Sequence, residues 1–390
     1  MTRRQAVATC AAALTSLAAE NKTGAAQRVS ILRVPGGGLQ PQVAVDDQGT
    51  LHLVYYTGDP HNGDVFYVRA PDAGTSAIRV NSQPGSAIAA GTIRGAQLAL
   101  GKAGRVHVAW NGSKPEGTLN PESGKRGAPM LYAHLDDAGA AFTPQRNLMR
   151  HSFGLDGGGS IAADRAGNVY VAWHGIGESE AKVPGREGEA RRRVWVTKSA
   201  DDGRTFSPEA KAWSQETGAC ACCGMKIFAD RRDNLFALYR SATESVHRNI
   251  YLLTSKDRGR SFEGRLLHEW NINACPMSSM DFAANGKTVM GAWETGGQVF
   301  WTRLDRDRAP VAAPGEGKGR KHPRVAVNQS GETLLVWTEG TGWQKGGSLA
   351  YQIFDSAGQP TGERKQLPGI PAWSFAAALS KPDNSFSIVY

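Results

Sequence analysis

One short pattern recurs along the chain and limits the folds that the chain can adopt. Each copy joins an alternating apolar strand, a turn with Gly or Asn, and a second strand that ends in an aromatic residue, as in AQLALGKAGRVHVAWNG and SIAADRAGNVYVAWHG. The seven closing aromatics are Tyr55, Trp110, Trp173, Tyr239, Trp293, Trp337 and Tyr390. They stand 44 to 66 residues apart, which is enough chain for four strands in each copy.

A third strand follows most copies, such as MLYAHLD, NIYLLTSKD or VFWTRLD, and a poorer fourth strand comes after it. Alternation with a period of two indicates strands, and no helical stripe persists for three turns. Four antiparallel strands repeated radially predict an all-β, seven-bladed β-propeller as a single domain over residues 20–390. Six blades are the alternative if one degenerate copy forms no blade. A β-sandwich is disfavoured because sandwiches do not repeat a unit at this period.

The seventh copy stops at Tyr390 after only two strands. A propeller has to close its ring. We therefore expect the segment RVSILRV, with Val29 to Val34 as its strand, to supply an outer strand to the last blade.

Composition agrees with many turns and excludes two classes of protein. The 390 residues include 47 Gly and 19 Pro, which exceeds average usage. No run approaches the roughly 20 apolar residues that an integral membrane segment requires. The net charge of +9 is scattered, without the basic stripe and interleaved aromatics that nucleic-acid binding would need.

The first 19 residues have the features of an export signal. Arg3 and Arg4 precede a weakly apolar, Ala-rich run, and Ala18 and Ala19 form a small-residue cleavage site. The paired arginines are similar to a twin-arginine signal, so a periplasmic or secreted location is expected. An N-terminal helix of the folded domain is the alternative.

Two segments share the pattern S-x-D-x-G-x-[TS]-F at the end of third strands. The residues that define them are Ser199, Asp201, Gly203 and Phe206 in the first, and Ser255, Asp257, Gly259 and Phe262 in the second. An Asp in such a turn accepts backbone N–H groups, Gly allows a positive φ, and the aromatic packs under the blade. We expect these segments to stabilise hairpins and to have no catalytic role.

These segments resemble the Asp boxes, or BNR repeats, of the sialidase superfamily. The resemblance implies that the ligand site lies on the face opposite the boxes. It also implies that any enzymatic activity would be glycoside hydrolysis of the exo-sialidase type, with arginines on a carboxylate, a Tyr nucleophile assisted by Glu, and an Asp acid. Arg33-Val34-Pro35 is similar to the family's Arg-Ile-Pro motif but is followed by three glycines.

Alignment of the repeats places polar residues at the mouth of the central channel on that face. The candidate catalytic residues are Asp156, Asp281, Glu294 and Tyr239. The candidate ligand-binding residues are Arg94, Arg240, His322, Arg324, Glu339 and Trp343. Mixed charges and aromatics around a concave mouth suit a polar ligand, although propeller channels are polar in any case. The run Gly157 to Gly159 lies at the same mouth.

Four cysteines are predicted to meet at this mouth. Cys220, Cys222 and Cys223 come before the fourth inner strand, and Cys275 comes at the equivalent position before the fifth. In an oxidising compartment, two disulfides with three alternative connectivities are the first expectation. A soft-metal site for copper, with Met225 and Met277 nearby, is the second. Zinc is disfavoured because C-x-C-C differs from C-x-x-C spacing, and redox activity is the third alternative.

The sequence thus predicts an exported, monomeric propeller that binds, and in an active form hydrolyses, a polar or anionic saccharide without a required cofactor. A metal or redox protein built on the cysteines is the first rival. A non-catalytic interaction platform is the second.

Overall fold

The computed structural model describes residues 28–70, 76–180, 187–286, 288–306 and 308–390. The predicted export signal, residues 1–19, lies outside the described residues. None of the described helices has both the length and the apolar character needed to cross a membrane.

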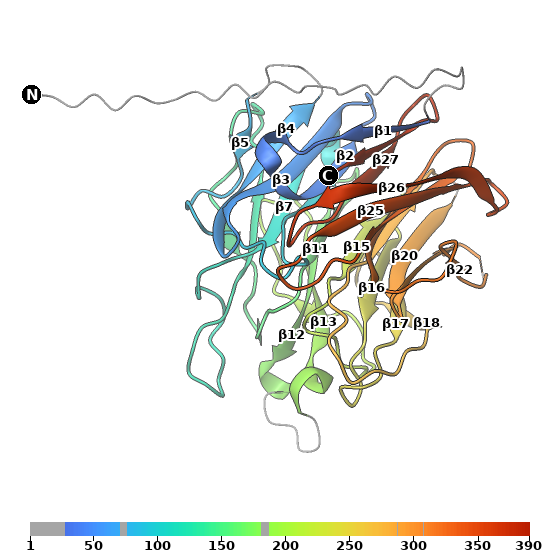
Figure 1. Ribbon diagram of the computed structural model, residues 1–390. Helices are drawn as coiled ribbons and strands as arrows, with labels where there is room; N and C mark the ends of the chain where they lie inside the picture. Colours follow the sequence, from blue (N-terminus) through green and yellow to red (C-terminus); the bar gives the residue numbers. More distant parts are fainter. Residues whose placement is uncertain (1–27, 71–75, 181–186, 287, 307) are drawn as a thin grey trace, which may run out of the picture.

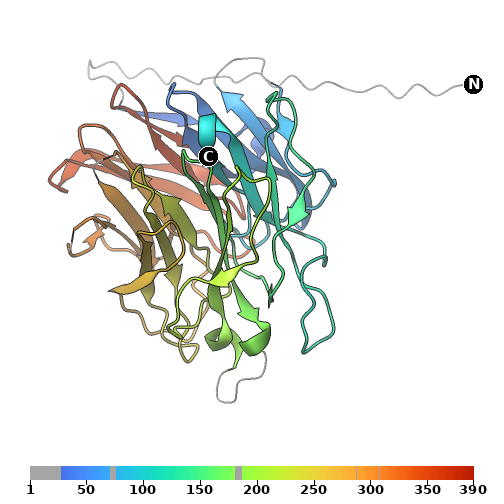
Figure 2. The same ribbon diagram turned by 180° about the vertical axis from the view of Figure 1, so that it is seen from behind.

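The described residues form seven sheets that fan around a centre in chain order (Figures 1 and 2). Blade 1 contains β2 (Leu39–Val45), β3 (Leu51–Asp59), β4 (Asn62–Ala70) and β5 (Ile78–Arg79). Blade 2 contains β6 (Gln97–Leu100), β7 (Val106–Asn111), β8 (Met130–His134) and β9 (Arg146–Asn147). Blade 3 contains β11 (Ser160–Ala163), β12 (Val169–Gly177), β13 (Arg193–Ser199) and β14 (Ala210–Lys211), with β10 (Ser152–Phe153) paired to the end of β12.

Blades 4 to 6 repeat the same antiparallel order of four strands, and blade 7 has three strands. Blade 4 contains β15 (Lys226–Ala229), β16 (Leu235–Arg240), β17 (Ile250–Ser255) and β18 (Glu263–His268). Blade 5 contains β19 (Asp281–Ala284), β20 (Val289–Thr295), β21 (Gln298–Arg303) and β22 (Val311–Ala312). Blade 6 contains β23 (Arg320–Val327), β24 (Thr333–Glu339), β25 (Gly347–Phe354) and β26 (Pro360–Ile370). Blade 7 contains β27 (Ala377–Ser380), β28 (Phe386–Val389) and β1 (Val29–Leu32).

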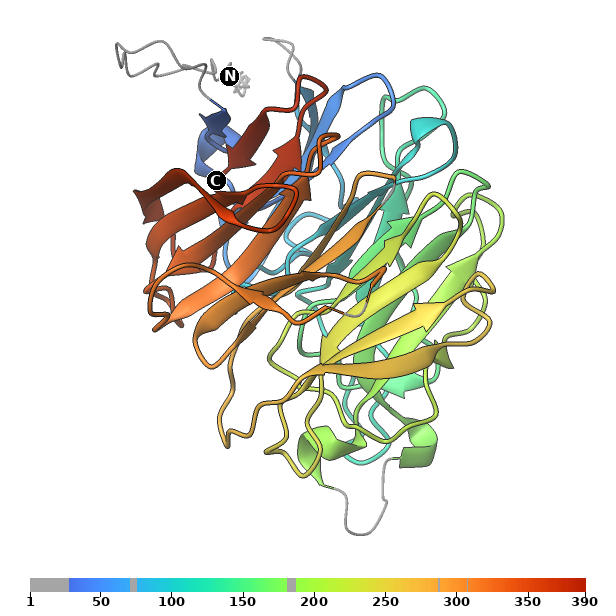
Figure 3. The same cartoon turned by 90° about the vertical axis from the view of Figure 1, so that its right-hand side faces the viewer.

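Four short 3-10 helices lie in the connections: η1 (Pro35–Gly37), η2 (Lys102–Gly104), η3 (Glu178–Glu180) and η4 (Gly188–Arg191). The connection between β12 and β13, which carries η3 and η4, projects from one end of the molecule (Figure 3). The predicted seven-bladed propeller is confirmed.

The two ends of the described chain close the ring together. β1 pairs with β28, and both Val34 N–H to Tyr390 O, at 3.2 Å, and Tyr390 N–H to Leu32 O, at 3.0 Å, join the two ends. In Figure 1, β1 lies near the C-terminus in the same blade as β27, and β28 lies between these two strands in the sheet. The prediction that Val29 to Val34 completes the last blade is confirmed, with the difference that β1 runs parallel to its partner.

The first and second strands of all seven blades pair in one register. In each blade, one inner-strand residue lies opposite the residue that precedes the closing aromatic; these residues are Gln42, Gln97, Ser160, Lys226, Asp281, Arg324 and Ala377. Lys226 Nζ donates to Gln97 Oε1 at 2.8 Å and to Gln42 Oε1 at 3.3 Å, and lies 3.9 Å from Asp281 Oδ1. Because these partners come from three other blades, this set of side chains meets on the axis.

The closing aromatics fill the core between neighbouring blades. Trp110, Trp173, Trp293 and Trp337 are at most 1% exposed. Trp173 packs with side chains of blades 2 and 3, and Trp337 packs with side chains of blades 5 and 6. The apolar clusters therefore join each blade to its neighbour.

Both Asp boxes have the expected hairpin geometry. Asp201 Oδ1 accepts the Thr205 N–H at 2.8 Å, Asp201 Oδ2 accepts the Thr205 hydroxyl at 2.6 Å, and Gly203 has a φ of +79°. Asp257 and Ser261 repeat these two contacts at 3.0 and 2.6 Å. These hydrogen bonds support the structural role that the sequence predicted.

Asp202 stands inside the first Asp box, between Asp201 and Gly203, and its side chain links blade 3 to blade 2. Its Oδ2 accepts from Arg105 Nε at 2.5 Å, and its Oδ1 lies 3.4 Å from His107 Nε2. Burial raises the pKa of Asp202, but the contacts with His107 and Arg105 outweigh burial and lower this pKa to about 2.

We expect Asp202→Asn to make the free energy of unfolding depend less on pH in the acidic range. The folded-state pKa lies below the ordinary value of 3.8. The carboxylate therefore stabilises the native state above pH 4 and loses this contribution as the pH falls through about 2. Urea unfolding between pH 2 and pH 7 measures the effect. Asp47→Asn is the control because its pair with Arg165 is exposed on both sides; an equal flattening in both variants would contradict the assignment.

We expect the ring closure to depend on the buried face of β1. Val29 is 4% exposed and Leu32 is 37% exposed on the same strand. Val29→Ala should lower the free energy of unfolding by about 2 kcal/mol, whereas Leu32→Ala should change it by less than about 0.5 kcal/mol. Chemical denaturation measures both values, and equal losses would argue against a closing role for this strand.

Candidate functional site

The connections into the inner strands gather at one face of the ring, as the repeat register predicted. Arg94 precedes β6, Asp156 precedes β11, and the cysteine loop 220–223 precedes β15. Ile93 lies between these connections: its carbonyl oxygen contacts Gly158, and its side chain lies near Gly224. Four neighbouring connections thus form a continuous surface at the channel mouth, because Gly224 also lies near Ser279 before β19.

Arg94 and Asp156 form an ion pair at this face. Arg94 Nη2 donates to Asp156 Oδ1, Nε donates to the Asp156 carbonyl at 2.7 Å, and Nη1 donates to the Ala90 carbonyl at 2.9 Å. Asn111 Nδ2 donates to the Gly157 carbonyl at 2.8 Å and fixes the next residue. The Asp156 side chain keeps 40% of its surface exposed.

The run Gly157 to Gly159 is required by close packing. A Cβ on Gly157 would lie 2.4 Å from the carbonyl oxygens of both Ala221 and Cys223, and a Cβ on Gly158 would lie 1.7 Å from the Ile93 oxygen. None of the three has a positive φ. The glycines therefore allow the Asp156 loop to pass between the Arg94 loop and the cysteine loop.

Trp343 brings an aromatic ring from blade 6 to the Arg94 loop. It is 51% exposed. The point where a Cβ of Gly91 would lie is 2.8 Å from Arg94 Nη1 and 3.3 Å from Trp343 Cζ3. An exposed indole and a guanidinium are thus adjacent, although they come from different blades.

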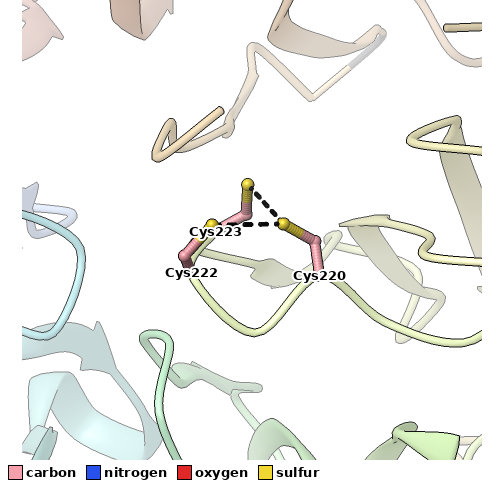
Figure 4. Close-up of side chains that lie close together, drawn as sticks. All are labelled: Cys220, Cys222 and Cys223. Carbon is pink, nitrogen blue, oxygen red and sulfur yellow. Dashed lines mark hydrogen bonds between the residues drawn. The ribbon is translucent and has the colours of Figure 1, made fainter. Parts of the chain in front are cut away.

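Three of the four predicted cysteines converge (Figure 4). Cys220 Sγ lies 3.0 Å from Cys223 Sγ and 3.5 Å from Cys222 Sγ, and all three sulfurs lie within 4.8 Å of one another. A disulfide would need about 2.05 Å, so these three cysteines and Cys275 are free thiols in the structure. Cys220 and Cys223 are buried, Cys222 is half-buried and Cys275 is exposed. Cys275 lies beside Cys222 and outside the group of three.

The spacing of the cysteines corrects one part of the sequence interpretation. Cys220 and Cys223 themselves stand in C-x-x-C spacing, and they have the shortest separation between sulfurs that the structure gives. The spacing argument against zinc was therefore wrong. Met225, expected near the sulfurs, packs in the apolar core between blades 3 and 4.

Hydrogen bonds and two buried arginines hold the loop that carries the three sulfurs. Cys220 N–H donates to the Arg240 carbonyl at 2.9 Å, and Ala221 N–H donates to Glu189 Oε1 at 2.5 Å. Arg248 Nη1 lies 2.5 Å from Glu189 Oε2. Arg240 Nε, Arg248 Nε and His174 Nδ1 are buried and have no hydrogen-bond partner among the described residues.

Because of this environment, the three thiols differ in pKa. Burial raises the pKa of the Cys223 thiol, but hydrogen bonds from Cys220 and Cys222, the charge of Arg240 and the Ser278 N–H together lower this pKa well below its ordinary value. The pKa values of Cys220 and Cys222 are raised. Cys223 is accordingly the most acidic of the three thiols, and Cys220 Sγ donates to its sulfur at 3.0 Å.

Arg240 and Glu294 form a buried pair next to the cysteines. Arg240 Nη2 lies 3.0 Å from Glu294 Oε2, and both residues are 2% exposed. Glu294 Oε1 also accepts the Gly297 N–H at 2.7 Å. Burial raises the pKa of Glu294 although Arg240 opposes the shift.

Several other predicted residues are held by the scaffold. Tyr239 is 2% exposed in the core between blades 3 and 4, and its hydroxyl lies 2.6 Å from Thr217 Oγ1. Glu339 Oε1 accepts from Arg320 Nε at 3.0 Å and from Trp337 Nε1 at 2.8 Å.

The positions at the axis are also buried. Arg324 Nη1 donates to Ser279 Oγ at 3.2 Å, and its guanidinium lies over the Phe375 ring. Burial lowers the pKa of His322 to about 3. Asp281 Oδ2 accepts the Val325 N–H at 3.1 Å.

Arg33 of the Arg-Val-Pro segment stacks on Tyr390 at the ring closure.

Sequence reasoning named Arg240 and Glu294, which directly follow closing aromatics, but missed Asn111 and His174 at the same position of other blades. These residues face the same connections: Asn111 lies beside Gly157, and His174 Nε2 lies 2.8 Å from the Cys223 carbonyl. Their polar character at a repeated position was a signal that the sequence offered. Glu189 lies in the β12–β13 connection, outside the repeated strands, and gave no signal.

A cavity of about 600 Å³ lies elsewhere. Its walls include turns between the first and second strands of several blades, such as Asp46–Gln48, Ala103–Gly104 and Asp230–Arg232. It therefore opens at the opposite end of the channel from the cysteine loop. The predicted mouth is a closely packed surface.

We expect Gly157→Ala to displace the cysteine loop. The added methyl group would lie 2.4 Å from two backbone oxygens and from the His174 ring, so we expect a loss of more than about 2 kcal/mol in unfolding free energy. Thermal unfolding and the rate of thiol modification measure the two effects. Gly127→Ala is the matched control, since no atom lies within 4 Å of its Cβ position. Unchanged thiol reactivity in Gly157→Ala would contradict the packing argument.

Comparisons with known proteins identify the architecture. No family model matches the sequence, and no curated protein matches it significantly. Among solved structures, the Hadza microbial sialidase Hz136 is 13% identical, with a TM-score of 0.52 over 87% of this chain and 73% of that chain. A K499G mutant of the NanB sialidase from Streptococcus pneumoniae is 11% identical, with a TM-score of 0.52 over 88% and 81% of the two chains.

A third solved structure is not a sialidase. The Penicillium chrysogenum alpha-L-arabinanase complexed with arabinobiose is 14% identical, with a TM-score of 0.51 over 82% of this chain and 94% of that chain. At these identities the likeness concerns the fold. The chain has a divergent sialidase-like propeller fold, as its Asp boxes predicted.

Proposed function

We propose that this chain binds a polar saccharide at the face formed by the Arg94, Asp156 and Trp343 loops. The observation that carries the proposal is the exposed Trp343 ring next to the Arg94–Asp156 pair. Sugar rings present C–H faces and hydroxyl groups, so a site that recognises them combines an aromatic surface with hydrogen-bonding groups. The propeller fold, shared with sialidases and an arabinanase, is consistent with this proposal.

The ion pair favours a neutral sugar over an anionic one. Arg94 uses three of its five N–H groups on Asp156 and Ala90, and the adjacent Asp156 carboxylate would repel a sugar carboxylate. Asp156 Oδ2 accepts no hydrogen bond from the described residues and is available to sugar hydroxyl groups. The proposal therefore narrows the expected ligand to a neutral saccharide.

Binding, without sialoside hydrolysis, is the activity that we propose. The candidate nucleophile Tyr239 lies in the core, and burial raises the pKa of its hydroxyl. The candidate Glu294 is bound to Arg240. From the signal-like residues 1–19, we further propose that the protein acts after export.

Calorimetric titration of the purified chain with neutral oligosaccharides and with a sialoside tests the proposal. We expect a neutral oligosaccharide to bind and Trp343→Ala to weaken this binding about fivefold, because one aromatic contact contributes about 1 kcal/mol. Trp343→Phe should retain most of the affinity. Leu119→Ala is the control, because Leu119 is 49% exposed and lies in the β7–β8 connection.

Two results would overturn the proposal. One is the absence of binding to every saccharide in the panel. The other is preferential binding of the sialoside, which would restore the anionic ligand that the sequence alone suggested.

A further inference from the structure

We propose that Cys220, Cys222 and Cys223 form a three-sulfur binding site for Cu(I). The site goes beyond saccharide binding and does not depend on it. It rests on the convergence of the sulfurs, on the buried cations around them, and on the access that Cys222 provides.

The sulfurs are close to the arrangement that one metal ion requires. A metal with bonds to sulfur of about 2.3 Å, placed at the centre of three sulfurs, holds them about 4 Å apart. The observed separations of 3.0 and 3.5 Å are shorter than this value by about 1 Å or less, and all three sulfurs lie within 4.8 Å of one another. Rotation of side chains in one four-residue loop is enough to open the group.

The loop itself is held from several sides. The Ala221 and Cys220 N–H groups are bonded to Glu189 and Arg240, and Gly224 N–H donates to the Ser278 carbonyl at 2.9 Å. The Gly157 backbone packs directly against the carbonyls of residues 221 and 223. The backbone that presents the sulfurs is thus fixed before any ion binds.

The surrounding charges suit an anionic group of thiolates. Three thiolates with one monovalent ion carry a net charge of −2, which would be costly in a buried site without cations. Arg240 and Arg248 are 2% and 3% exposed, and their Nε atoms are among the buried donors without a partner. Arg240 and Arg248 both interact electrostatically with the charge on Cys223. Arg240 and Arg248 also pair with Glu294 and Glu189, but their unpartnered Nε groups remain available to balance negative charge on the sulfurs.

The donor set favours Cu(I) over zinc. Thiolates are soft ligands that suit Cu(I), zinc and iron–sulfur clusters, but zinc in structural sites takes four tetrahedral ligands. The structure brings three sulfurs together and leaves Cys275 exposed outside the group. Three sulfur ligands without a fourth match a monovalent ion of low coordination number.

Burial argues against a thiol-exchange role for the same residues. Reactive cysteines are partly exposed, whereas Cys220 is 0% exposed and Cys223 is 1% exposed. Cys222 is half-buried and gives an ion a path to the two buried sulfurs. When Cu(I) binds, the S–H bonds of Cys220 and Cys222 break, their protons pass to solvent, and no electron is transferred.

Titration of the anaerobically reduced chain with Cu(I), in competition with bicinchoninate, tests the site. We expect one equivalent to bind with a near-ultraviolet charge-transfer band, and Cys220→Ser or Cys223→Ser to weaken binding at least 100-fold. Cys275→Ser is the matched control and should retain both the stoichiometry and the affinity. Circular dichroism of each variant reports whether the propeller remains folded.

A second measurement uses the unmodified chain and so does not depend on the folding of variants. Bound Cu(I) should protect the half-buried Cys222 from alkylation while the exposed Cys275 remains reactive, as mapped by peptide mass spectrometry with and without the ion. Uptake of Zn(II) in place of Cu(I), a Cys275→Ser loss equal to that of Cys223→Ser, or alkylation of Cys222 that Cu(I) leaves unchanged would each overturn the proposal. None of these readouts involves saccharide binding, so failure here is distinguishable from failure of the proposed function.

Discussion

The common register of the first two strands is the constraint on which the rest of the structure depends. In all seven blades, the first and second strands pair so that one inner-strand residue lies opposite the residue that precedes the closing aromatic. A slip by one residue would turn the aromatic out of the core and move the polar axis residue into it. The register therefore fixes the core, the axis and the position of every connection at the mouth together.

Repetition made the fold readable from sequence, because each of seven copies carries the same signal. The register also predicted that Cys275 would join the other cysteines, but the three sulfurs that converge come from one four-residue loop and Cys275 lies outside the group. Side-chain pairing was less readable. Nothing in one sequence shows that Arg94 binds Asp156, that Glu294 binds Arg240, or that Tyr239 faces Thr217. These pairings depend on how connections of unequal length fold over one another, and Glu189 lies in such a connection.

The mouth is organised around closely packed backbone, and its charges are already matched in the absence of a ligand. Gly157 and Gly158 leave no room for side chains, so three neighbouring connections behave as one layer. Within this layer the arginines differ: Arg94 has its donors engaged at the surface, whereas Arg240 and Arg248 retain buried donors beside sulfur. The two sites that we propose follow from this difference, since one offers an exposed carboxylate and ring and the other a cationic, buried environment.

The closing strand also sets the order in which this molecule can be completed. Ser30 and Phe386 are hydrogen-bonded although 356 residues separate them. During synthesis, blades 1 to 6 can form in sequence, but blade 7 has to wait until its last residues leave the ribosome. Until then, the flanks of blades 1 and 6 that face the gap remain exposed to solvent. Closure of such distant contacts is slow because of the entropy of joining the chain ends. A partly synthesised chain therefore forms an incomplete ring of blades. In the finished protein, the pairing of β1 with β28 holds both ends of the described chain, so loss of this pairing frees both ends together.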